Sequence, residues 1–376
     1  MKKFVLFYLS LLLTLTAFTC CRDDEKSNPT ALKQISMTTK QSGKVVIRIG
    51  GSDTISINWG DGTAVETYIL TPAKNDGALG IWGDDYIYSH TYYGSYQHTI
   101  TVTGESISHL DCSYSQLTSL IVSKNPALIH LVCGNNQLTS LDVSKNPMLT
   151  LLCCSFNQLS SLDVSKNPAL KTIECCHNQL ISLDVSNNNA LEYLWCDHNQ
   201  LTLLNVSNNP VLIYLWCHYN QLSSFDISKS KALTFLHCDY NQLTTLNVSN
   251  NPALVYLHCN NNQLISLNVS NNSKLEYLYC NNYQLTLLDT SKNNELFYFF
   301  CGYNELISLE ISKYNSRLIS FGCQFNYLSA SALNSLFESL SKVYNNYYRY
   351  ISIGGNPGTG DCDRTIATEK GWTVFD

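Results

Sequence analysis

A 21-residue repeat occupies the middle of this 376-residue chain and limits what it can fold into. Each unit reads Leu-x-x-Leu-x-Cys-x-x-Asn-Gln-Leu-x-x-Leu-Asp/Asn-Val-Ser-x-Asn-x-x, numbered here from its first leucine, so the frame Leu-x-x-Leu-x-(Cys or Val)-x-x-Asn occurs twice in it. Self-similarity at a fixed period predicts a solenoid, in which every unit packs against its neighbours. The cysteine of position six marks the copies, with one extra residue before the last: Cys112, Cys133, Cys154, Cys175, Cys196, Cys217, Cys238, Cys259, Cys280, Cys301 and Cys323.

The repeat closely resembles the nested 21-residue class of bacterial leucine-rich repeats, over roughly residues 105–328. This resemblance implies a mainly β protein, a right-handed solenoid of about 11 coils with parallel strands. The doubled frame predicts a short bridge or strand on each side of every coil. Leucines and cysteine would point inward from one wall, and leucines and valine from the other, so Cys and Val fill one narrow core.

The asparagine of position nine is expected to turn inward, where its amide can bond backbone groups that a tight turn leaves unpaired. The pattern lapses at Ser115, in the first coil, and at Tyr283, where we expect a local defect. The remaining copies predict a ladder made of Asn136, Asn157, Asn178, Asn199, Asn220, Asn241, Asn262, Asn304 and Asn326.

The cysteine row predicts buried thiols that are not in disulfides. Parallel side chains in a packed row rarely offer the disulfide torsion, and a straight row does not converge tetrahedrally on zinc. Cys153, Cys176 and Cys362 lie off the row. They are the candidates for an exposed, reactive thiol.

The N-terminus, residues 1–21, has the features of a secretory signal: two lysines, an apolar run and a Cys pair. It resembles the lipobox of bacterial lipoproteins, which implies acylation of Cys21, with Cys20 as the alternative. The following "RDDE" resembles the export signal of Bacteroidetes surface lipoproteins. Together these resemblances imply an exported protein, lipid-anchored to the bacterial outer membrane and surface-exposed; soluble secretion is the alternative. Residues 22–37 would form a linker.

Two flanking segments are expected around the solenoid. Residues 38–104 contain short β-branched or alternating runs. Their Trp-Gly-Asp-Gly (59–62) and His-Thr-Tyr (90–92) resemble signatures of polycystic-kidney-disease-like domains, which implies a β-sandwich that covers the edge of the first coil. Residues 329–376 predict a small α/β cap, with a helix after Ser329, then a strand and turn over 348–358.

Positions three and five of each coil should face solvent, because side chains alternate along a strand. In coils five to ten all twelve of these residues are aromatic or histidine, whereas the second half of each unit carries mostly hydroxyl and acidic or amide residues. Exposed aromatic strips mark interaction sites. This aromatic face, the predicted ligand-binding site, consists of Tyr193, Trp195, Tyr214, Trp216, Phe235, His237, Tyr256, His258, Tyr277, Tyr279, Tyr298 and Phe300.

We interpret the chain as a non-enzymatic cell-surface protein that binds an extracellular or host protein through this face. Carbohydrate is the main alternative ligand, because flat rings also stack on sugars. A structural envelope protein that pairs with another copy of itself is a further alternative, as is simple cross-strand stacking. The formal net charge of −6, without a basic cluster, disfavours nucleic acid as a partner.

No phosphate loop, nucleophile elbow or isolated pair of glutamates supports catalysis, and no cofactor is expected. Position seven offers acid and imidazole groups that neighbouring coils would bring within reach of one cation. A solvated ladder of this kind needs no metal, so no metal site is predicted. The weak candidates in the column are Asp197, His218 and Asp239, with Cys176, His177 and His198 beside them.

Overall fold

The computed structural model describes residues 33–70, 87–281, 284–342 and 348–376. They belong to one compact unit, Leu32–Asp376. The signal segment with Cys20 and Cys21, most of the proposed linker, and Tyr283 lie outside the described residues. No helix in the described part is both long and apolar enough to span a membrane.

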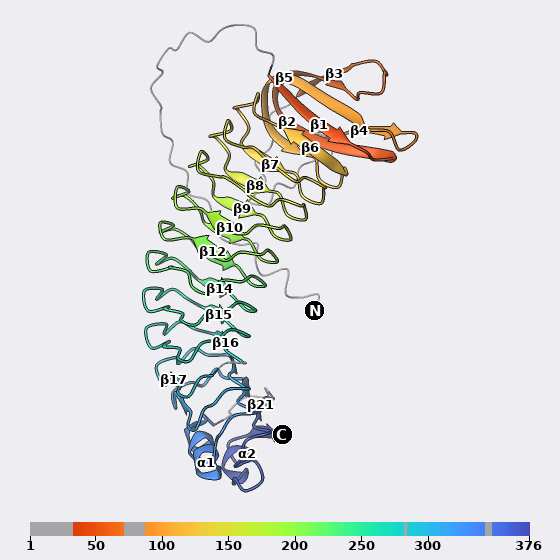
Figure 1. Cartoon of the computed structure of the whole chain (residues 1–376). Helices are drawn as coiled ribbons and strands as arrows, with labels where there is room; N and C mark the ends of the chain where they lie inside the picture. The colour runs from red at the N-terminus through yellow and green to blue at the C-terminus, as the bar shows by residue number, and fades with distance from the viewer. Residues whose placement is uncertain (1–32, 71–86, 282–283, 343–347) are drawn as a thin grey trace. The chain divides into compact units, whose positions relative to one another are not determined.

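The repeats form a β-solenoid whose coils stack one on another (Figure 1). Positions three to five of each coil form a short strand that pairs in parallel and in register with the next coil, as Tyr193↔Tyr214 and Trp195↔Trp216 illustrate. The mainly β solenoid with one strand per predicted coil is confirmed. In order, these strands are β5 (His98–Asp111), β7 (His130–Val132), β8 (Leu151–Cys153), β9 (Thr172–Glu174), β11 (Tyr193–Trp195), β13 (Tyr214–Trp216), β14 (Phe235–His237), β15 (Tyr256–His258), β16 (Tyr277–Tyr279), β18 (Tyr298–Phe300) and β20 (Ser320–Gly322).

The second side of the coils is less regular than predicted. Among the described residues it carries β6 (Leu117–Ile121) and two parallel pairs, β10 (Ser182–Asp184) with β12 (Leu203–Asn205) and β17 (Asp289–Thr290) with β19 (Glu310–Ile311). The expectation of a strand on this side of every coil is therefore wrong. An Asx turn follows this segment both in coils without a strand, where Asp142 Oδ1 accepts from the Ser144 N–H (2.9 Å), and in coils with one, where Asp184 Oδ1 accepts from the Ser186 N–H (2.9 Å).

The cysteine row lies in the core as predicted. All eleven cysteines of position six are fully buried, between leucines of both walls, and the described cysteines are thiols rather than disulfides. Burial raises the thiol pKa values, to about 12 for Cys154 and Cys323. Thiolate formation at neutral pH is therefore suppressed, and the row acts as small apolar packing.

The asparagine ladder of position nine is also confirmed. Asn220 Nδ2 donates to the carbonyls of Cys196 (3.0 Å) and Cys217 (3.1 Å), and its Oδ1 accepts from the Leu201 N–H (2.9 Å). One side chain thus joins two successive coils. In the first coil, the Ser115 hydroxyl instead donates to the carbonyl of Val46 in the N-terminal sheet (3.2 Å).

A second asparagine ladder follows position nineteen and was not predicted. Asn209 is fully buried, and its Nδ2 donates to the carbonyls of Val185 (3.0 Å) and Asn188 (2.9 Å) in the preceding coil. Where Ser230 replaces the asparagine, its hydroxyl makes the corresponding bond to the carbonyl of Asn209 (3.0 Å). Both turns of the solenoid are therefore held by buried side chains that bond the neighbouring coil.

The N-terminal segment is antiparallel and continuous with the solenoid. Strand β1 (Gln34–Thr39) pairs with β5 and β6, while β2 (Gly43–Asn58) pairs with β3 (Glu66–Leu70), β4 (Ile87–Tyr92) and β5. β5 continues into the first coil, where it pairs in parallel with β7. The predicted strands are thus present, while their arrangement as a two-layer sandwich stays a prediction.

The two motifs of the N-terminal segment pack against each other. The Trp59 ring is fully buried and stacks on His90 at 5.1 Å between centroids, and the Tyr92 hydroxyl donates to the Trp59 carbonyl (2.5 Å). Asp61 caps its own turn by accepting from the Thr63 N–H (3.1 Å), and lies 2.6 Å from His90 Nε2. These residues therefore hold a turn together.

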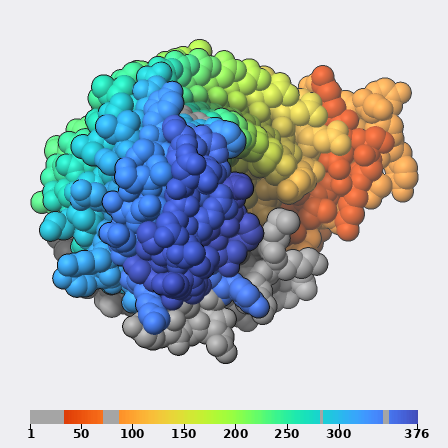
Figure 2. All heavy atoms as spheres, turned by 90° about the horizontal axis from the view of Figure 1, so that it is seen from below, coloured from red at the N-terminus to blue at the C-terminus, as the bar shows by residue number. Residues whose placement is uncertain are grey.

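The C-terminal cap prolongs the solenoid sheet. Helix α1 (Ala330–Ser339) begins after Ser329, whose hydroxyl accepts from the Ala332 N–H. Strands β21 (Arg349–Ser352) and β22 (Trp372–Phe375), separated by α2 (Thr365–Thr368), then pair in parallel with β20 and with each other. Figure 2, a view from the cap end, shows cap atoms covering this end of the molecule.

The buried cysteine row predicts the labelling of the protein by a thiol reagent. The native chain should react slowly at the eleven row positions and completely in denaturant, because burial suppresses the thiolate. Mass analysis of labelled peptides measures this. Rapid native labelling along the row, or masses that show row cysteines already paired, would contradict the packing described here.

The first asparagine ladder predicts a local contribution to stability. Asn220→Ala should lower the free energy of unfolding by about 2–4 kcal/mol, because it leaves buried backbone groups of two coils unpaired. Asn271→Ala is the matched control, since this exposed side chain makes a single bond to the Ser249 carbonyl, and it should cost less than about 0.5 kcal/mol. Urea unfolding measures the free energy of unfolding of both variants. Equal losses would contradict the stabilising role of the position-nine ladder.

Candidate functional site

The aromatic face predicted from the sequence is one continuous surface on the parallel strands. In the position-three column, six rings from Tyr193 to Tyr298 stack on one another with centroid separations between 4.3 and 5.7 Å and interplanar angles of 30° or less. Parallel in-register pairing produces this arrangement, because it places equivalent side chains of successive coils side by side.

The position-five column is less uniform. Trp195 and Trp216 meet edge to face (6.1 Å, 88°), whereas Tyr279 and Phe300 at the other end are stacked (5.2 Å, 20°). His237 and His258 lie between them with their rings tilted by 57°. The structure therefore brings all twelve predicted residues together.

These twelve side chains are less exposed than predicted. Most are half-buried, and Phe235 is 8% exposed, so the expectation of a fully solvent-facing position is wrong for that residue. The cause is the stacking itself, since each ring covers the faces of its neighbours. The half-buried rings expose only part of their surface, and the indole Nε1 of Trp216 is buried.

A third aromatic column, missed by the sequence analysis, lies at position eight. Its residues adopt the left-handed backbone conformation, with φ between 50° and 57°. Tyr219 and Tyr240 are 45% and 46% exposed and stack at 4.3 Å with 8° between their planes. The signal was present in the sequence as the residue before each position-nine asparagine. The described copies are Tyr114, Asn135, Phe156, His177, His198, Tyr219, Tyr240, Asn261, Tyr303 and Phe325.

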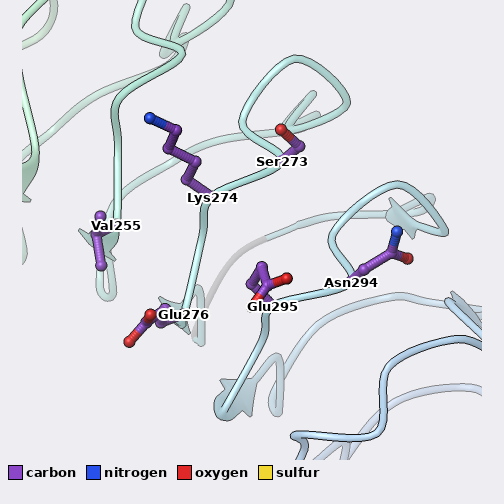
Figure 3. Close-up of a pocket in the computed structure, with 6 residues that line it drawn as sticks. All are labelled: Val255, Ser273, Lys274, Glu276, Asn294 and Glu295. Atoms are coloured by element: carbon purple, nitrogen blue, oxygen red, sulfur yellow. The ribbon is translucent and has the colours of Figure 1, made fainter.

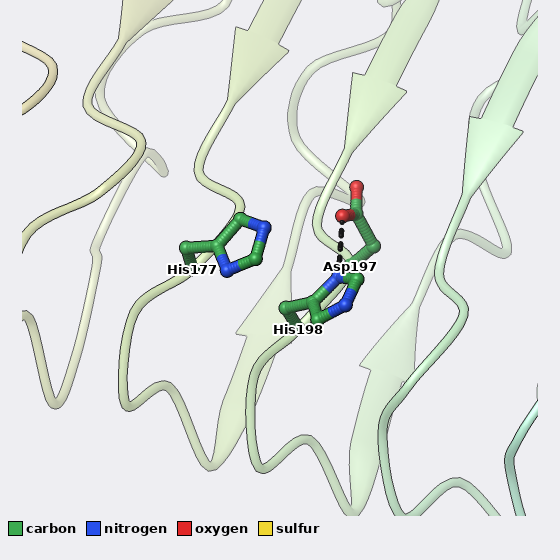
Figure 4. A group of neighbouring side chains, drawn as sticks. All are labelled: His177, Asp197 and His198. Carbon is green, nitrogen blue, oxygen red and sulfur yellow. Dashed lines mark hydrogen bonds and ion pairs between the residues drawn. The ribbon is translucent and has the colours of Figure 1, made fainter.

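The acid and imidazole groups at and near position seven form two groups rather than one column. In the first, Asp197 is buried and its Oδ2 lies 2.9 Å from His198 Nδ1 and 3.7 Å from His218 Nε2. Donor atoms of His177, Asp197 and His198 lie within 4.8 Å of one another (Figure 4). The rings of His177 and His198 are stacked at 4.1 Å and 18°.

The second group belongs to the next coils. Donor atoms of His237, Asp239 and His258 lie within 4.8 Å of one another, and His237 Nε2 is 3.1 Å from Asp239 Oδ2. The sequence prediction named Asp239 but not the two histidines in this role. His218, its third candidate, stacks on His237 at 3.9 Å between the two groups.

Burial lowers the pKa of several histidines on this face. The pKa of His218 falls to about 4 because of desolvation, with a further contribution from His237, and desolvation likewise lowers the pKa of His258 to about 4. Burial also lowers the pKa of His177. His218 and His258 are therefore neutral imidazoles at pH 7.

The two off-row cysteines on this face are only partly exposed. Cys153 donates to Glu174 Oε2 (3.3 Å) and Cys176 to Asp197 Oδ1 (2.9 Å). Burial and these carboxylates raise the pKa of both thiols well above the ordinary value. The raised pKa values oppose thiolate formation, so these two of the three candidates are not activated as nucleophiles.

A shallow pocket of about 490 Å³ lies on the loops before strands β15, β16 and β18, off the strand face. Its two carboxylates, on Glu276 and Glu295, both contact Arg317 (3.5 and 2.5 Å). Both carboxylates are therefore ion-paired with one arginine. Figure 3 shows its lining residues, Val255, Ser273, Lys274, Glu276, Asn294 and Glu295.

Solved structures of leucine-rich-repeat proteins share this fold. The functional domain of InlJ from Listeria monocytogenes, which includes a cysteine ladder, is similar with 33% sequence identity and a TM-score of 0.62; the match covers 72% of this chain and 59% of that one. The chain thus spans less than two thirds of the InlJ chain.

Two further structures agree in fold alone. An internalin (InlF) from Listeria monocytogenes has 19% identity and a TM-score of 0.54, over 72% of this chain and 86% of that chain. The leucine-rich-repeat domain of APL1B has 21% identity and a TM-score of 0.51, over 72% and 88%. No family model and no curated protein matches the sequence. The comparisons therefore establish the leucine-rich-repeat solenoid.

The lowered histidine pKa values predict a loss of stability in mild acid. The unfolded chain takes up these protons near pH 6.5, but folded His258 takes one up only near pH 4. Between these values the unfolded state binds more protons, so stability falls as pH falls, by up to about 1.4 kcal/mol per pH unit for each such group. Urea unfolding between pH 7 and 5 measures the slope.

His258→Tyr should reduce this slope by one group's contribution. Tyrosine fits the column, since Tyr279 occupies the same position in the next coil. An unchanged slope in the variant would show that His258 does not contribute.

Proposed function

We propose that this protein is a non-enzymatic binding protein that recognises an extracellular protein through the aromatic face and the position-eight column beside it. In keeping with the sequence resemblances, the proposal places it on the bacterial surface, exported and anchored through a lipid on Cys21, with residues 38–104 as a polycystic-kidney-disease-like domain next to the anchor. Leucine-rich-repeat solenoids are suited to this use, because stacked coils create extended binding surfaces.

The proposal rests on the conformational free energy that is lost when an aromatic residue occupies position eight. A non-glycine residue in the left-handed conformation costs of order 1–3 kcal/mol, and bulky residues fit it worse than asparagine. Asn135 and Asn261 adopt the same φ in this fold. Asparagine therefore suffices for the turn, and the rings of Tyr219, Tyr240 and Tyr303, about half exposed, are not needed for the core.

Stacking between the rings recovers only part of that cost, since an aromatic pair contributes about 0.5–1.5 kcal/mol. What remains is an exposed row of tyrosine, histidine and phenylalanine that continues the aromatic face. Tyrosine is favoured at protein interfaces because it has a rigid apolar body and a polar tip. Contact with a partner explains the rings better than stability does.

The stacking also favours protein over carbohydrate. Sugar rings stack on open aromatic faces, but in the position-three and position-eight columns neighbouring rings cover those faces. The edges and hydroxyl groups that remain suit side chains and backbone of a protein. The edge-to-face pair Trp195 and Trp216 is the exception, and it makes carbohydrate the second candidate ligand.

A binding screen tests the proposal. The chain from Arg22 onward, which retains every described residue, would be presented to purified extracellular-matrix proteins and to a panel of polysaccharides. Tyr219→Asn with Tyr240→Asn should weaken binding to a protein ligand by roughly 10-fold or more, because both rings leave the surface, while thermal unfolding stays unchanged or improves. Tyr114→Asn is the matched control, at position eight of the first coil and far from coils five to ten.

Other outcomes would point elsewhere. Polysaccharide binding that is lost in Trp195→Ala with Trp216→Ala, but kept in the tyrosine variant, would replace protein by carbohydrate as the ligand. Light scattering that shows a dimer dissociated by the tyrosine substitutions would identify self-association. Protein binding that is unchanged in both the double tyrosine variant and the double tryptophan variant would show that the aromatic surface is not the binding site.

A further inference from the structure

The two histidines of the second group lie on strands in the middle of the aromatic face, and its aspartate follows one of these strands. His237 ends β14 and His258 ends β15, and the two are direct partners in the parallel register. Asp239 follows His237 by two residues, and donor atoms of the three residues lie within 4.8 Å of one another. Strand positions hold ligands more accurately than loops do.

From this arrangement we propose that His237, Asp239 and His258 bind a divalent transition metal of the Zn²⁺ type. Two imidazoles and one carboxylate are a ligand set that zinc uses with an open fourth position. Bonds of about 2.1 Å in tetrahedral geometry separate neighbouring ligand atoms by roughly 3.4 Å. The observed 3.1 Å between His237 Nε2 and Asp239 Oδ2 is close to this value, and the other ligand atoms are separated by no more than 4.8 Å.

The surroundings of Asp239 support a metal. Asn260 donates its backbone N–H to Asp239 Oδ1 (2.6 Å) and its Nδ2 to Oδ2 (3.1 Å), which fixes the carboxylate. Ligating carboxylates are commonly held in this way.

Ring orientation separates this group from the first one. Imidazole binds a metal in its ring plane, and the planes of His237 and His258 are tilted by 57°, so they intersect. The rings of His177 and His198 are nearly parallel and stacked at 4.1 Å, so they cannot direct lone pairs at a single ion.

Metal titration of the chain from Arg22 onward tests the site without any knowledge of the partner, so its failure would leave the proposed function untouched. Calorimetry with Zn²⁺ should show one tight site, and Co²⁺ should give a tetrahedral visible spectrum without the charge-transfer band of a thiolate. His258→Tyr should weaken Zn²⁺ binding roughly 100-fold or more, and Asn260→Ala about 10-fold. His177→Ala is the matched control, with a histidine from the first group, and should change nothing.

The opposite pattern would overturn the proposal. Loss of binding in His177→Ala with full binding in His258→Tyr would move the site to the first group. A thiolate band would show that a cysteine ligates the ion. If Zn²⁺ gives no binding signal and does not change the unfolding transition of the unsubstituted chain, the three residues form only a hydrogen-bonded cluster. His237→Gln provides a second substitution should His258→Tyr destabilise the fold.

Discussion

The structure depends on hydrogen bonds from buried amide side chains to backbone groups of the tight turns. Without these bonds the backbone groups would be buried and unpaired. Each coil is too small to satisfy its own N–H and C=O groups, and only three residues per coil enter a regular ladder on the strand side. The amides of position nine and position nineteen supply the missing partners, and in each case the bond reaches into the adjacent coil. A coil is therefore stable only beside its neighbours, as in other repeat architectures.

The surface chemistry follows from this constraint. The buried amides hold successive coils in one register, so equivalent residues lie side by side. A residue type that recurs at one position of the repeat therefore forms a column of side chains along the solenoid. The twelve residues of the aromatic face and the position-eight column owe their contacts to that alignment. The histidine and aspartate groups arise in the same way, from single substitutions placed side by side in adjacent coils.

Much of the fold was predictable because the repeat encodes it directly. The period, the cysteine row and the position-nine ladder depend on local rules repeated in every coil. The position-eight column was missed because strand alternation says nothing about a residue that leaves the strand in a left-handed turn, as Tyr240 does. Similarly, the burial of Phe235 depends on rings from neighbouring coils, and the path of β5 across Gly104 depends on pairing with residues more than forty positions away.

The shared strand β5 has a mechanical consequence. Strand β1, the first strand described, lies between β5 and β6 and is antiparallel to both. Tension applied along β1 from the N-terminal side would load two hydrogen-bond ladders in shear, so many bonds must break together. The same strand β5 passes that load into the first coil through β7. The N-terminal sheet would therefore resist such a force through β1, β5 and β6 together, before the coils of the solenoid separate from one another.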